Sequence, residues 1–406
     1  MMTVAQLTDW RRWREVRLRA LADAPDAFGE TLAHAHTRDE ASWQSMVAHD
    51  PLRVVLAAED AGAIVGTAVV RVAADARLAN LFAMWVAPEA RGHGAGRLLV
   101  AAATRWARLA GASSLELRVT VSNVAAFELY RRTGFVETGE RAPVRDGSTL
   151  EATTMALRLP PLVMGVVNVT PDSFSDGGAY LDPAAAIAHG EALLADGADL
   201  LDIGGEATNP RAQPITAAEE LRRVLPVIEA LRGAPLSIDT TKAEVARAAI
   251  AAGATIVNDV SGGLFDAAMP AALAGHDVTY IAGHLRGRSI TEVFAGEQPV
   301  TWREVADELA ERLTAFAANR IWVDPGLGFG KGADPATNRA LIDHAGDLGA
   351  ALGRPVVIGP SRKRFLRALV GEGDLDAASV TACLAGIAAG AQVVRIHDVK
   401  SLVAAM

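Results

Sequence analysis

A repeated alternation in the second half of the chain places the strongest constraint on its fold. From Val163 onward, eight short apolar runs occur, and each is followed by a stretch rich in Ala and Leu. Apolar runs of this length are typical of parallel strands buried on both faces, and their alternation with helical stretches indicates βαβ units. Eight such units match the size of a (β/α)8 barrel, and a doubly wound sheet is the alternative. The runs begin near Val163, Leu200, Leu236, Thr255, Val278, Ile321, Val356 and Gln392.

The first part of the chain is organised differently. Helical segments there alternate with strand-like apolar runs in no regular repeat. A chain of 406 residues is also long enough for two or more domains. We therefore predict a mixed α/β domain over residues 1–159 and a barrel domain over residues 160–406. Pro160 and Pro161 form a short, stiff spacer between them.

Composition excludes several functional classes. Residues 1–159 hold 19 Arg, no Lys and 18 acidic residues, a net charge of +1, and the remainder carries 20 basic and 30 acidic residues, a net charge of −10. Neither part has the basic excess of a nucleic-acid-binding surface. No apolar run approaches the roughly 20 residues of a membrane helix, and the charged N-terminus is unlike a signal peptide. With Cys383 as the single cysteine, we expect a soluble, cytoplasmic protein without a membrane or nucleic-acid partner.

Polar residues follow most of the barrel strands, and the carboxyl ends of those strands share one rim. Buried carboxylates and an asparagine there require hydrogen-bond donors from a ligand, such as the edge of an amino-pyrimidinone ring. On an opposite wall, the cationic group of Arg362, Lys363, Arg395 and His397 suits a phosphate or diphosphate. Asn168 offers a neutral oxygen that suits Mg²⁺. The strand-end residues are Asn168, Asp202, Glu206, Asp239, Asn258, Asp259, Asp324, Ser361, Arg362, Lys363, Arg395 and His397.

A glycine-rich turn stands out in the first domain. Residues 86–96, VAPEARGHGAG, follow a strand and open into a helix, so that free backbone N–H groups can hold a pyrophosphate. An ordinary loop before a helix is the alternative. Residues 123–135, NVAAFELYRRTGF, follow the next strand, with Asn123 as the N-cap of a helix that ends at Gly134. Tyr130 is either a catalytic acid or a core residue beside Phe135.

Together these two segments resemble the GNAT family of acetyl-CoA-dependent N-acetyltransferases. The resemblance implies that acetyl-CoA binds with its pyrophosphate on the turn and that Tyr130 protonates the departing thiolate. No residue stands out as the general base, and the acceptor amine is not evident. The implied acetyl-CoA site comprises Val86, Arg91, Gly92, His93, Gly94, Ala95, Gly96, Asn123 and Tyr130.

Seven segments of the second part are similar to dihydropteroate synthase, in order and in spacing. The resemblance implies Mg²⁺-dependent condensation of 6-hydroxymethyl-7,8-dihydropterin diphosphate with p-aminobenzoate, which gives dihydropteroate and diphosphate. It also implies a homodimer formed through the barrel. A pterin-binding paralogue with altered activity, beside a non-catalytic N-terminal module, is the alternative. The segments are NVTPDSFSDGG (168–178), DIGGEAT (202–208), SIDTTK (237–242), NDVSGG (258–263), VDPGLGFGK (323–331), GPSRKRFL (359–366) and RIHDV (395–399).

The resemblance also assigns roles to individual residues of the barrel. Catalytic and pterin-binding roles fall to Asp239, Asn258, Asp324 and Lys363, and Thr208 is assigned both to the pterin and to the p-aminobenzoate. Asn168, Arg395 and His397 bind the diphosphate, with Asn168 nearest the metal. The p-aminobenzoate contacts Phe174, Pro210, Phe329, Ser361 and Arg362.

The chain departs from the family's usual pattern at two positions. Asn209 stands where an arginine is usual, and Gly283 stands where a methionine is usual. Both lie on substrate-facing elements, so we expect them to affect substrate preference. The chain has only four lysines against 35 arginines, which suggests specific roles for Lys331 and Lys363. We expect Lys242 and Lys400 to be structural or surface residues.

Overall fold

A computed structural model describes residues 2–73, 77–170, 182–210, 213–316, 320–332 and 334–406. The chain divides into two compact units, Met1–Pro160 and Pro161–Met406. Each unit has its own hydrophobic core. Within the described residues, no helix is long and apolar enough to cross a membrane.

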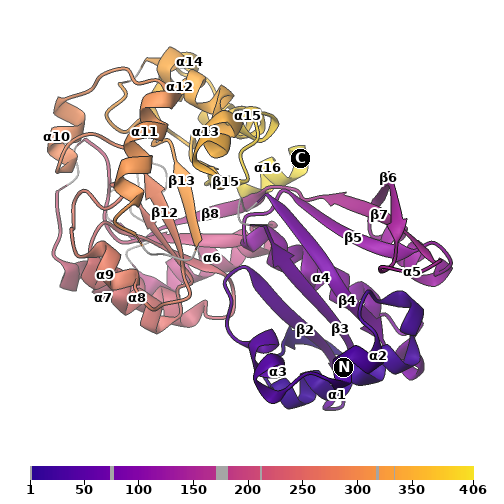
Figure 1. The fold of residues 1–406 in the computed structure, drawn as a ribbon. Helices are drawn as coiled ribbons and strands as arrows, with labels where there is room; N and C mark the ends of the chain where they lie inside the picture. Colours follow the sequence, from indigo (N-terminus) through magenta and orange to yellow (C-terminus); the bar gives the residue numbers. More distant parts are fainter. Residues whose placement is uncertain (1, 74–76, 171–181, 211–212, 317–319, 333) are drawn as a thin grey trace. The chain divides into compact units, whose positions relative to one another are not determined.

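The N-terminal unit is built on a seven-stranded sheet (Figure 1). Its strands are β1 (Thr3–Gln6), β2 (Arg53–Asp60), β3 (Ala63–Val72), β4 (Leu78–Val86), β5 (Ser114–Thr120), β6 (Val136–Pro143) and β7 (Glu151–Arg158). Its helices are α1 (Trp10–Asp23), α2 (Leu32–His36), α3 (Glu40–Val47), α4 (Ala95–Leu109) and α5 (Val124–Arg132). The strand order is β1-β2-β3-β4-β5-β7-β6, and every neighbouring pair is antiparallel except β4 and β5. The predicted mixed α/β architecture is confirmed.

Strands β4 and β5 pair over only part of their length. The parallel ladder joins Leu78–Leu81 to Ser114–Leu117 and ends there. On its other side, β4 has an irregular register with β3 near Ala83, whose φ of 48° is unusual for a residue with a Cβ. Such a bulge bends a strand and increases its twist. As a result, β4 separates from β5 and leaves a gap in the middle of the sheet.

The second unit is a barrel of eight parallel strands. They are β8 (Leu162–Asn168), β9 (Leu200–Gly204), β10 (Leu236–Asp239), β11 (Ile256–Asp259), β12 (Thr279–Gly283), β13 (Arg320–Asp324), β14 (Val357–Ile358) and β15 (Val393–Ile396). The order is β13-β12-β11-β10-β9-β8-β15-β14, and a parallel bridge between Val323 and Val356 joins the two ends. Each strand begins within one residue of its predicted start. This closure confirms the barrel and excludes the open, doubly wound sheet.

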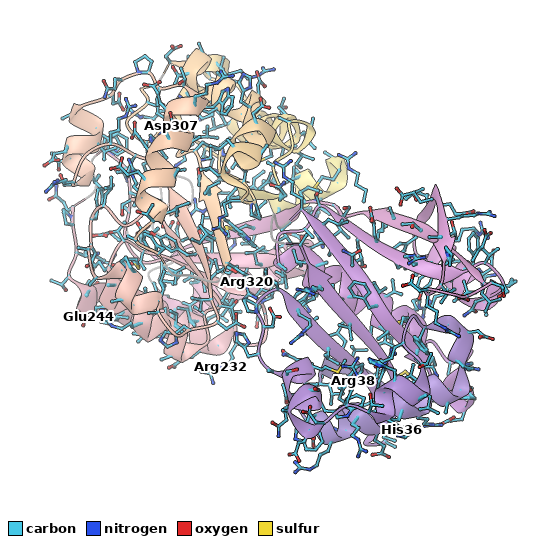
Figure 2. The ribbon with its side chains drawn as sticks, in the orientation of Figure 1. His36, Arg38, Arg232, Glu244, Asp307 and Arg320 are labelled. Atoms are coloured by element: carbon cyan, nitrogen blue, oxygen red, sulfur yellow. The ribbon has the colours of Figure 1, made fainter. Side chains whose placement is uncertain are left out.

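Helices surround the barrel strands, and many of their charged residues are exposed, although Glu220 on α7 is buried. Glu244 on α8 and Asp307 on α11 are exposed examples (Figure 2). The helices are α6 (Pro183–Ala195), α7 (Ala217–Ala230), α8 (Ala243–Ala252), α9 (Met269–Leu273), α10 (Ile290–Ala295), α11 (Trp302–Leu313), α12 (Pro335–Asp343), α13 (Ala345–Leu352), α14 (Arg364–Val370), α15 (Leu375–Ala388) and α16 (Val399–Ala405). Because the strands are buried on both faces, only their ends are free to carry polar side chains into a site.

Candidate functional site

The carboxyl ends of the barrel strands enclose a small polar cavity. Aspartates from β10 and β13, an asparagine from β11 and an arginine from β15 meet there, together with side chains from the loops. The barrel thus brings together residues that are up to 187 positions apart in the sequence. The cavity is lined by Thr208, Asp239, Asn258, Val260, Asp324, Leu327, Phe329, Gly359, Lys363 and Arg395.

Asp202 links the polar groups of this cavity. It is fully buried on β9, and its Oδ2 accepts hydrogen bonds from Arg395 Nε (2.5 Å) and Asn258 Nδ2 (2.9 Å). Arg395 also donates from Nη2 to Asp239 Oδ2 at 2.8 Å. One guanidinium therefore joins two carboxylates, and it holds Asp239 at the cavity wall. The sequence placed Asp202 at a strand end but gave it no specific role.

Burial sets the protonation of the cavity residues. It raises the pKa of Asp239 to about 7, with a further increase from Asp202, while Arg395 and Lys363 oppose the shift. It also raises the pKa of Asp324, whose Oδ1 accepts a hydrogen bond from Gly326 N at 2.6 Å. Conversely, burial and nearby Arg395 lower the pKa of Lys363 to about 8. Asp239 and Lys363 therefore change charge near neutral pH, as acid–base groups of active sites often do.

The expectation of separate acidic and cationic walls is wrong for two of the cations. Arg395 lies between Asp202 and Asp239, and Lys363 lines the same cavity, with Nζ 3.9 Å from the centroid of the Phe329 ring. His397 is not a cation at neutral pH, because burial and nearby Arg362 hold its pKa well below the usual range. Acidic and basic groups are therefore interleaved in one pocket, where each partly neutralises the others.

A second polar group lies beside this cavity. Ser361 Oγ is 2.8 Å from His397 Nδ1, and Asn168 Nδ2 is 3.5 Å from His397 Nε2. Arg362, with a φ of 58°, turns its side chain to Asp376 of α15 and makes a bidentate pair at 2.7 and 3.0 Å. The ion pair therefore holds the Arg362 side chain at the first turn of α15.

The other residues predicted to contact p-aminobenzoate differ in their exposure. Thr208 and Phe329 line the cavity, whereas Pro210 is exposed. Phe174 lies outside the described residues. The sequence did not single out Val260, Leu327 and Gly359, because apolar residues and glycines next to polar motifs carry no chemical pattern of their own.

Two of the lysines, Lys331 and Lys242, stabilise loops next to the cavity through hydrogen bonds and ion pairs. Lys331 is buried outside it and donates from Nζ to the carbonyl oxygens of His284 (2.9 Å) and Phe329 (3.1 Å). Lys242 donates to Glu206 Oε2 and Glu220 Oε2, at 2.6 Å each. The predicted structural role of Lys242 is confirmed, and Lys331 also acts through the backbone rather than through the cavity.

Gly283 is required by close packing at the end of β12. A Cβ at this position would lie 2.5 Å from the carbonyl oxygen of Val260 and 2.6 Å from its Cα. In this chain a larger side chain at residue 283 does not fit. Val260, which lines the cavity, occupies the space instead.

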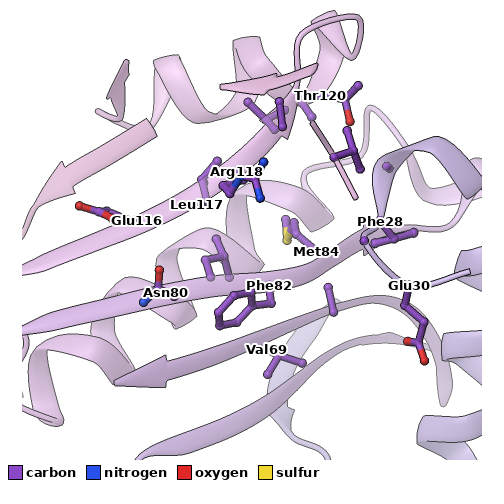
Figure 3. Close-up of a pocket in the computed structure, with 18 of the residues that line it drawn as sticks. Phe28, Glu30, Val69, Asn80, Phe82, Met84, Glu116, Leu117, Arg118 and Thr120 are labelled. Atoms are coloured by element: carbon purple, nitrogen blue, oxygen red, sulfur yellow. The ribbon is translucent and has the colours of Figure 1, made fainter. Parts of the chain in front are cut away.

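The N-terminal unit has a larger cavity, of about 690 Å³. It lies where β4 and β5 separate, and its lining includes Leu81–Met84 of β4 and Glu116–Thr120 of β5. Figure 3 shows Asn80 and Glu116 at one end and Phe28 and Glu30 at the other. The helix α5 contributes Asn123, Ala126 and Tyr130 to the lining.

The glycine-rich turn has the backbone geometry that the sequence predicted. Gly92 and Gly94 have φ values of 79° and 92°, and Gly94 is the N-cap of α4. No described hydrogen bond occupies the N–H of Gly92, Gly94 or Gly96. A Cβ on Gly96 would lie 2.8 Å from Leu129 Cδ2. The turn can therefore present free N–H groups to an anion.

The other predicted acetyl-CoA residues have structural partners. Arg91 bonds to Asp23 and to the carbonyl oxygen of Val86, and Ala95 is buried. His93 donates from its backbone N–H to the carbonyl oxygen of Ala90, with a nitrogen–oxygen distance of 3.4 Å. Asn123 caps α5 by accepting from Ala126 N at 3.2 Å, as predicted. Tyr130 packs against Phe135 and also lines the cavity, so it belongs to both the core and the site.

Burial of the Tyr130 phenol raises its pKa above the usual value. The phenol is therefore protonated at neutral pH and is available as a hydrogen-bond donor.

Comparison with known families agrees with this division of the chain. Residues 164–397 match the family model described as "Pterin binding enzyme". Residues 13–135 match the model described as "Acetyltransferase (GNAT) family". The N-terminal unit is therefore a GNAT domain, and the barrel carries the pterin-binding family pattern.

Known relatives match the barrel. The dihydropteroate synthase of Streptococcus pyogenes serotype M3 is 42% identical over 251 residues, which cover 59% of this chain and 91% of that protein. The solved structure of Xanthomonas albilineans dihydropteroate synthase with 4-aminobenzoic acid is 43% identical, with a TM-score of 0.55, and covers 62% of this chain and 92% of that one. Burkholderia cenocepacia dihydropteroate synthase complexed with 7,8-dihydropteroate is 39% identical, with a TM-score of 0.54, over 62% of this chain and 91% of that one.

Proposed function

The match over residues 164–397 makes this chain a member of the pterin-binding enzyme family, and we propose that its barrel condenses 6-hydroxymethyl-7,8-dihydropterin diphosphate with p-aminobenzoate. The products are dihydropteroate and diphosphate. The observation that carries the proposal is the cavity at the strand ends, where Asp239, Asn258, Asp324 and Lys363 converge.

The pterin would lie in this cavity with its polar edge toward the carboxylates. Its amino group and ring N–H are donors, which match the oxygens of Asp239 and Asp324. Asn258 is held by Asp202, so its side-chain carbonyl oxygen is free to accept a further donor. Lys363 would donate to a ring acceptor and pack on Phe329. Thr208 closes the cavity from the loop after β9.

The diphosphate would lie beside His397, Arg395 and Asn168. Because His397 is neutral, it would bind phosphate by donating a hydrogen bond rather than by charge. Mg²⁺ fits this place as an ion that arrives with the diphosphate. The described residues contain no group of three His, Cys, Asp or Glu side chains that would hold a metal. The amide oxygen of Asn168, phosphate oxygens and water form the kind of ligand set that Mg²⁺ accepts.

When bound, Mg²⁺ would withdraw charge from the leaving diphosphate. The protein's own part is to stabilise positive charge that develops on the pterin methylene, and the nearby carboxylates of Asp239 and Asp324 serve this role. The p-aminobenzoate amine then attacks the methylene carbon as the bond to the diphosphate oxygen breaks. We place its ring against Phe329, Ser361 and Pro210, and the role assigned to Phe174 stays an expectation because that residue lies outside the described ranges. Its carboxylate lies toward the backbone of Ser361 and Arg362.

Complementation of a strain that lacks dihydropteroate synthase tests this proposal. Wild-type protein should restore growth, whereas Asp239→Asn should not, because the change removes the carboxylate that accepts the pterin donors. Asp307→Asn, at an exposed position on α11, is the matched control and should restore growth. Failure of both the wild type and the control would refute the enzymatic proposal. Growth with Asp239→Asn would refute the assigned role.

For the N-terminal domain we propose acetyl transfer from acetyl-CoA to an amine. The pyrophosphate would bind the free N–H groups at the start of α4, and the acetyl group would reach the cavity through the gap between β4 and β5. Tyr130 would give its proton to the departing thiolate. Titration with acetyl-CoA tests binding, and Tyr130→Phe should bind normally but transfer at least 10-fold more slowly. The absence of binding would refute both catalysis and acetyl-CoA sensing.

We also propose a cytoplasmic homodimer formed through the barrel. The proposal follows the family resemblance, and the single cysteine supports a reducing compartment. Light scattering of the full chain tests the dimer, and a monomeric mass would contradict it.

A further inference from the structure

A row of polar side chains crosses the floor of the N-terminal cavity. One residue comes from each of four neighbouring strands: Arg53, Arg71, Asn80 and Glu116. The ladders pair Arg53 with Arg71, Arg71 with Asn80, and Asn80 with Glu116. Residues paired directly across a sheet project from the same face. The four side chains therefore form one continuous line on the cavity side of the sheet.

The two arginines of this row are unusual neighbours. Like charges directly opposite each other on adjacent strands are destabilising. Arg53 donates to Ser45 O at 2.7 Å, and its Nε lies 3.8 Å from Asp50 Oδ2. Arg71 has neither an ion pair nor a side-chain hydrogen bond within the described part of the chain. An anionic group bound between the two arginines would relieve their repulsion.

The other end of the row is a carboxylate at the start of the gap. Asn80 and Glu116 form the last pair on this face before β4 and β5 separate after Leu81 and Leu117. Within the described residues, Glu116 makes no ion pair or side-chain hydrogen bond. A carboxylate beside the gap through which the acetyl group arrives is well placed to accept a proton from an amine.

Apolar surface lies next to the row. Val69 and Phe82 pair across β3 and β4, two residues along from Arg71 and Asn80, and both line the cavity (Figure 3). Phe82 is 49% exposed although it is aromatic. Two residues along a strand span about 7 Å, and Arg71 and Glu116 are two strand spacings apart, about 10 Å. This separation is on the order of the length of an aminobenzoic acid, so one such molecule can span from the arginine end of the row to Glu116.

We propose that the acceptor of the N-terminal domain is a small primary amine that carries a carboxylate at the far end of an apolar body. The inference rests on the acetyltransferase function proposed above and specifies its substrate. Arg71 and Arg53 bind the carboxylate, Phe82 and Val69 contact the apolar body, and Glu116 faces the amine.

The transfer step balances with these groups. The amine nitrogen forms a C–N bond to the acetyl carbonyl carbon, and the C–S bond of the thioester breaks. The proton lost from nitrogen goes to Glu116, and the proton of Tyr130 goes to the thiolate. The products are an N-acetyl carboxylic acid and free CoA, and no further reactant is needed.

Matched pairs of amines test the proposal with the full chain. We would measure CoA release with 4-aminobenzoate against its ethyl ester, 4-aminophenylacetate against aniline, and 6-aminohexanoate against hexylamine. Dihydropterin diphosphate is omitted, so the barrel cannot consume the aminobenzoate. In at least one pair, kcat/KM should be 10-fold or more higher for the carboxylate. Equal rates within every active pair would overturn the proposal.

Variants then assign the roles. Arg71→Gln should raise KM for the preferred carboxylate at least 10-fold and leave its neutral partner unchanged. Glu116→Gln should lower kcat at least 100-fold with little change in KM. Arg105→Gln, at an exposed position on α4, is the control and should match the wild type. An equal effect of Arg71→Gln on both members of a pair would refute the anion site.

The outcomes separate this inference from the function on which it rests. If acetyl-CoA binds but every amine of the panel is inert, the acceptor assignment is wrong and the cofactor site stands. If acetyl-CoA does not bind, the proposed acetyltransferase function fails and the acceptor assignment fails with it. Dihydropteroate synthase activity of each variant reports that the full chain is folded.

Discussion

Replacing Lys242 with methionine should destabilise the barrel and weaken p-aminobenzoate binding together. Lys242 Nζ lies 2.6 Å from Glu206 Oε2 and 2.6 Å from Glu220 Oε2, and Glu220 on α7 is fully buried. Lys242→Met therefore leaves a buried carboxylate without its cation. Removing one partner of a buried ion pair costs about 3–5 kcal/mol. Because 24% of the Lys242 side chain is exposed, we expect the lower end, about 3 kcal/mol.

The sign of the pH dependence follows from Glu220. Burial raises its pKa, and Lys242 opposes that increase. Without Lys242 the pKa rises further, so the folded state of the variant holds a proton that the unfolded state releases. The loss of stability should therefore be small near pH 5 and should grow toward pH 8.

Urea unfolding, followed by hydrogen exchange of barrel peptides, measures this loss separately from the N-terminal unit. Lys242→Met combined with Glu220→Gln should recover at least half of the stability, because the unpaired charge is gone. Lys400→Met, on the exposed side of α16, should change stability by less than about 0.5 kcal/mol. A loss below about 1 kcal/mol, or one that does not depend on pH, would refute the reasoning.

The functional consequence follows from the other carboxylate. Glu206 Oε1 accepts from Ile215 N at 2.8 Å, while Glu206 Oε2 accepts from Lys242. Thr208 lies on the loop between β9 and α7. The hydrogen bond between Glu206 and Ile215 joins the two ends of this loop. In Lys242→Met that loop loses one of its anchors, and KM for p-aminobenzoate should rise more than kcat falls. An unchanged KM would show that the loop does not depend on this lysine.

Three further outcomes follow from the barrel site. Because the pKa of Lys363 is lowered to about 8, kcat/KM for the dihydropterin diphosphate should fall above that pH as the cation is lost, and Lys363→Arg should remove this fall in a pH–rate profile. Asp202→Asn should lower kcat/KM at least 10-fold, because Arg395 loses one of its two charged partners, and steady-state kinetics with normal circular dichroism would show this. Gly283→Ala should destabilise the barrel by about 1–3 kcal/mol in urea unfolding, because its Cβ meets the Val260 backbone, and a neutral result would show that β12 can shift.

Much of the fold follows from the sequence because both units rely on local patterns. The apolar runs predicted the barrel strands to within one residue, and the helix beginning at Asn123 was predicted with its cap. The same strand ends supplied the cavity residues Asp239, Asn258, Asp324 and Lys363. These residues were predictable because a parallel strand carries its functional residues at one end.

The sequence alone did not reveal how the charged side chains pair. Arg395 was assigned to a cationic wall, but barrel closure places β15 near β9 and β10, so its guanidinium reaches Asp202 and Asp239. His397 was counted as a cation, but burial keeps it neutral. Arg362 is paired with Asp376 from α15. The protonation state of a side chain and its choice of ion-pair partner depend on burial and on distances between side chains. Neither can be read from the sequence.

The sequence by itself determined the two domains, the barrel and the strand ends that carry its chemistry, because hydrophobic periodicity and turn residues act locally. Only the tertiary structure brought Arg53, Arg71, Asn80 and Glu116 into one row. These residues come from four strands that span 64 positions, and their alignment depends on register across the sheet. The part of the N-terminal site that would recognise the acceptor is thus set by strand pairing, which the sequence pattern does not display.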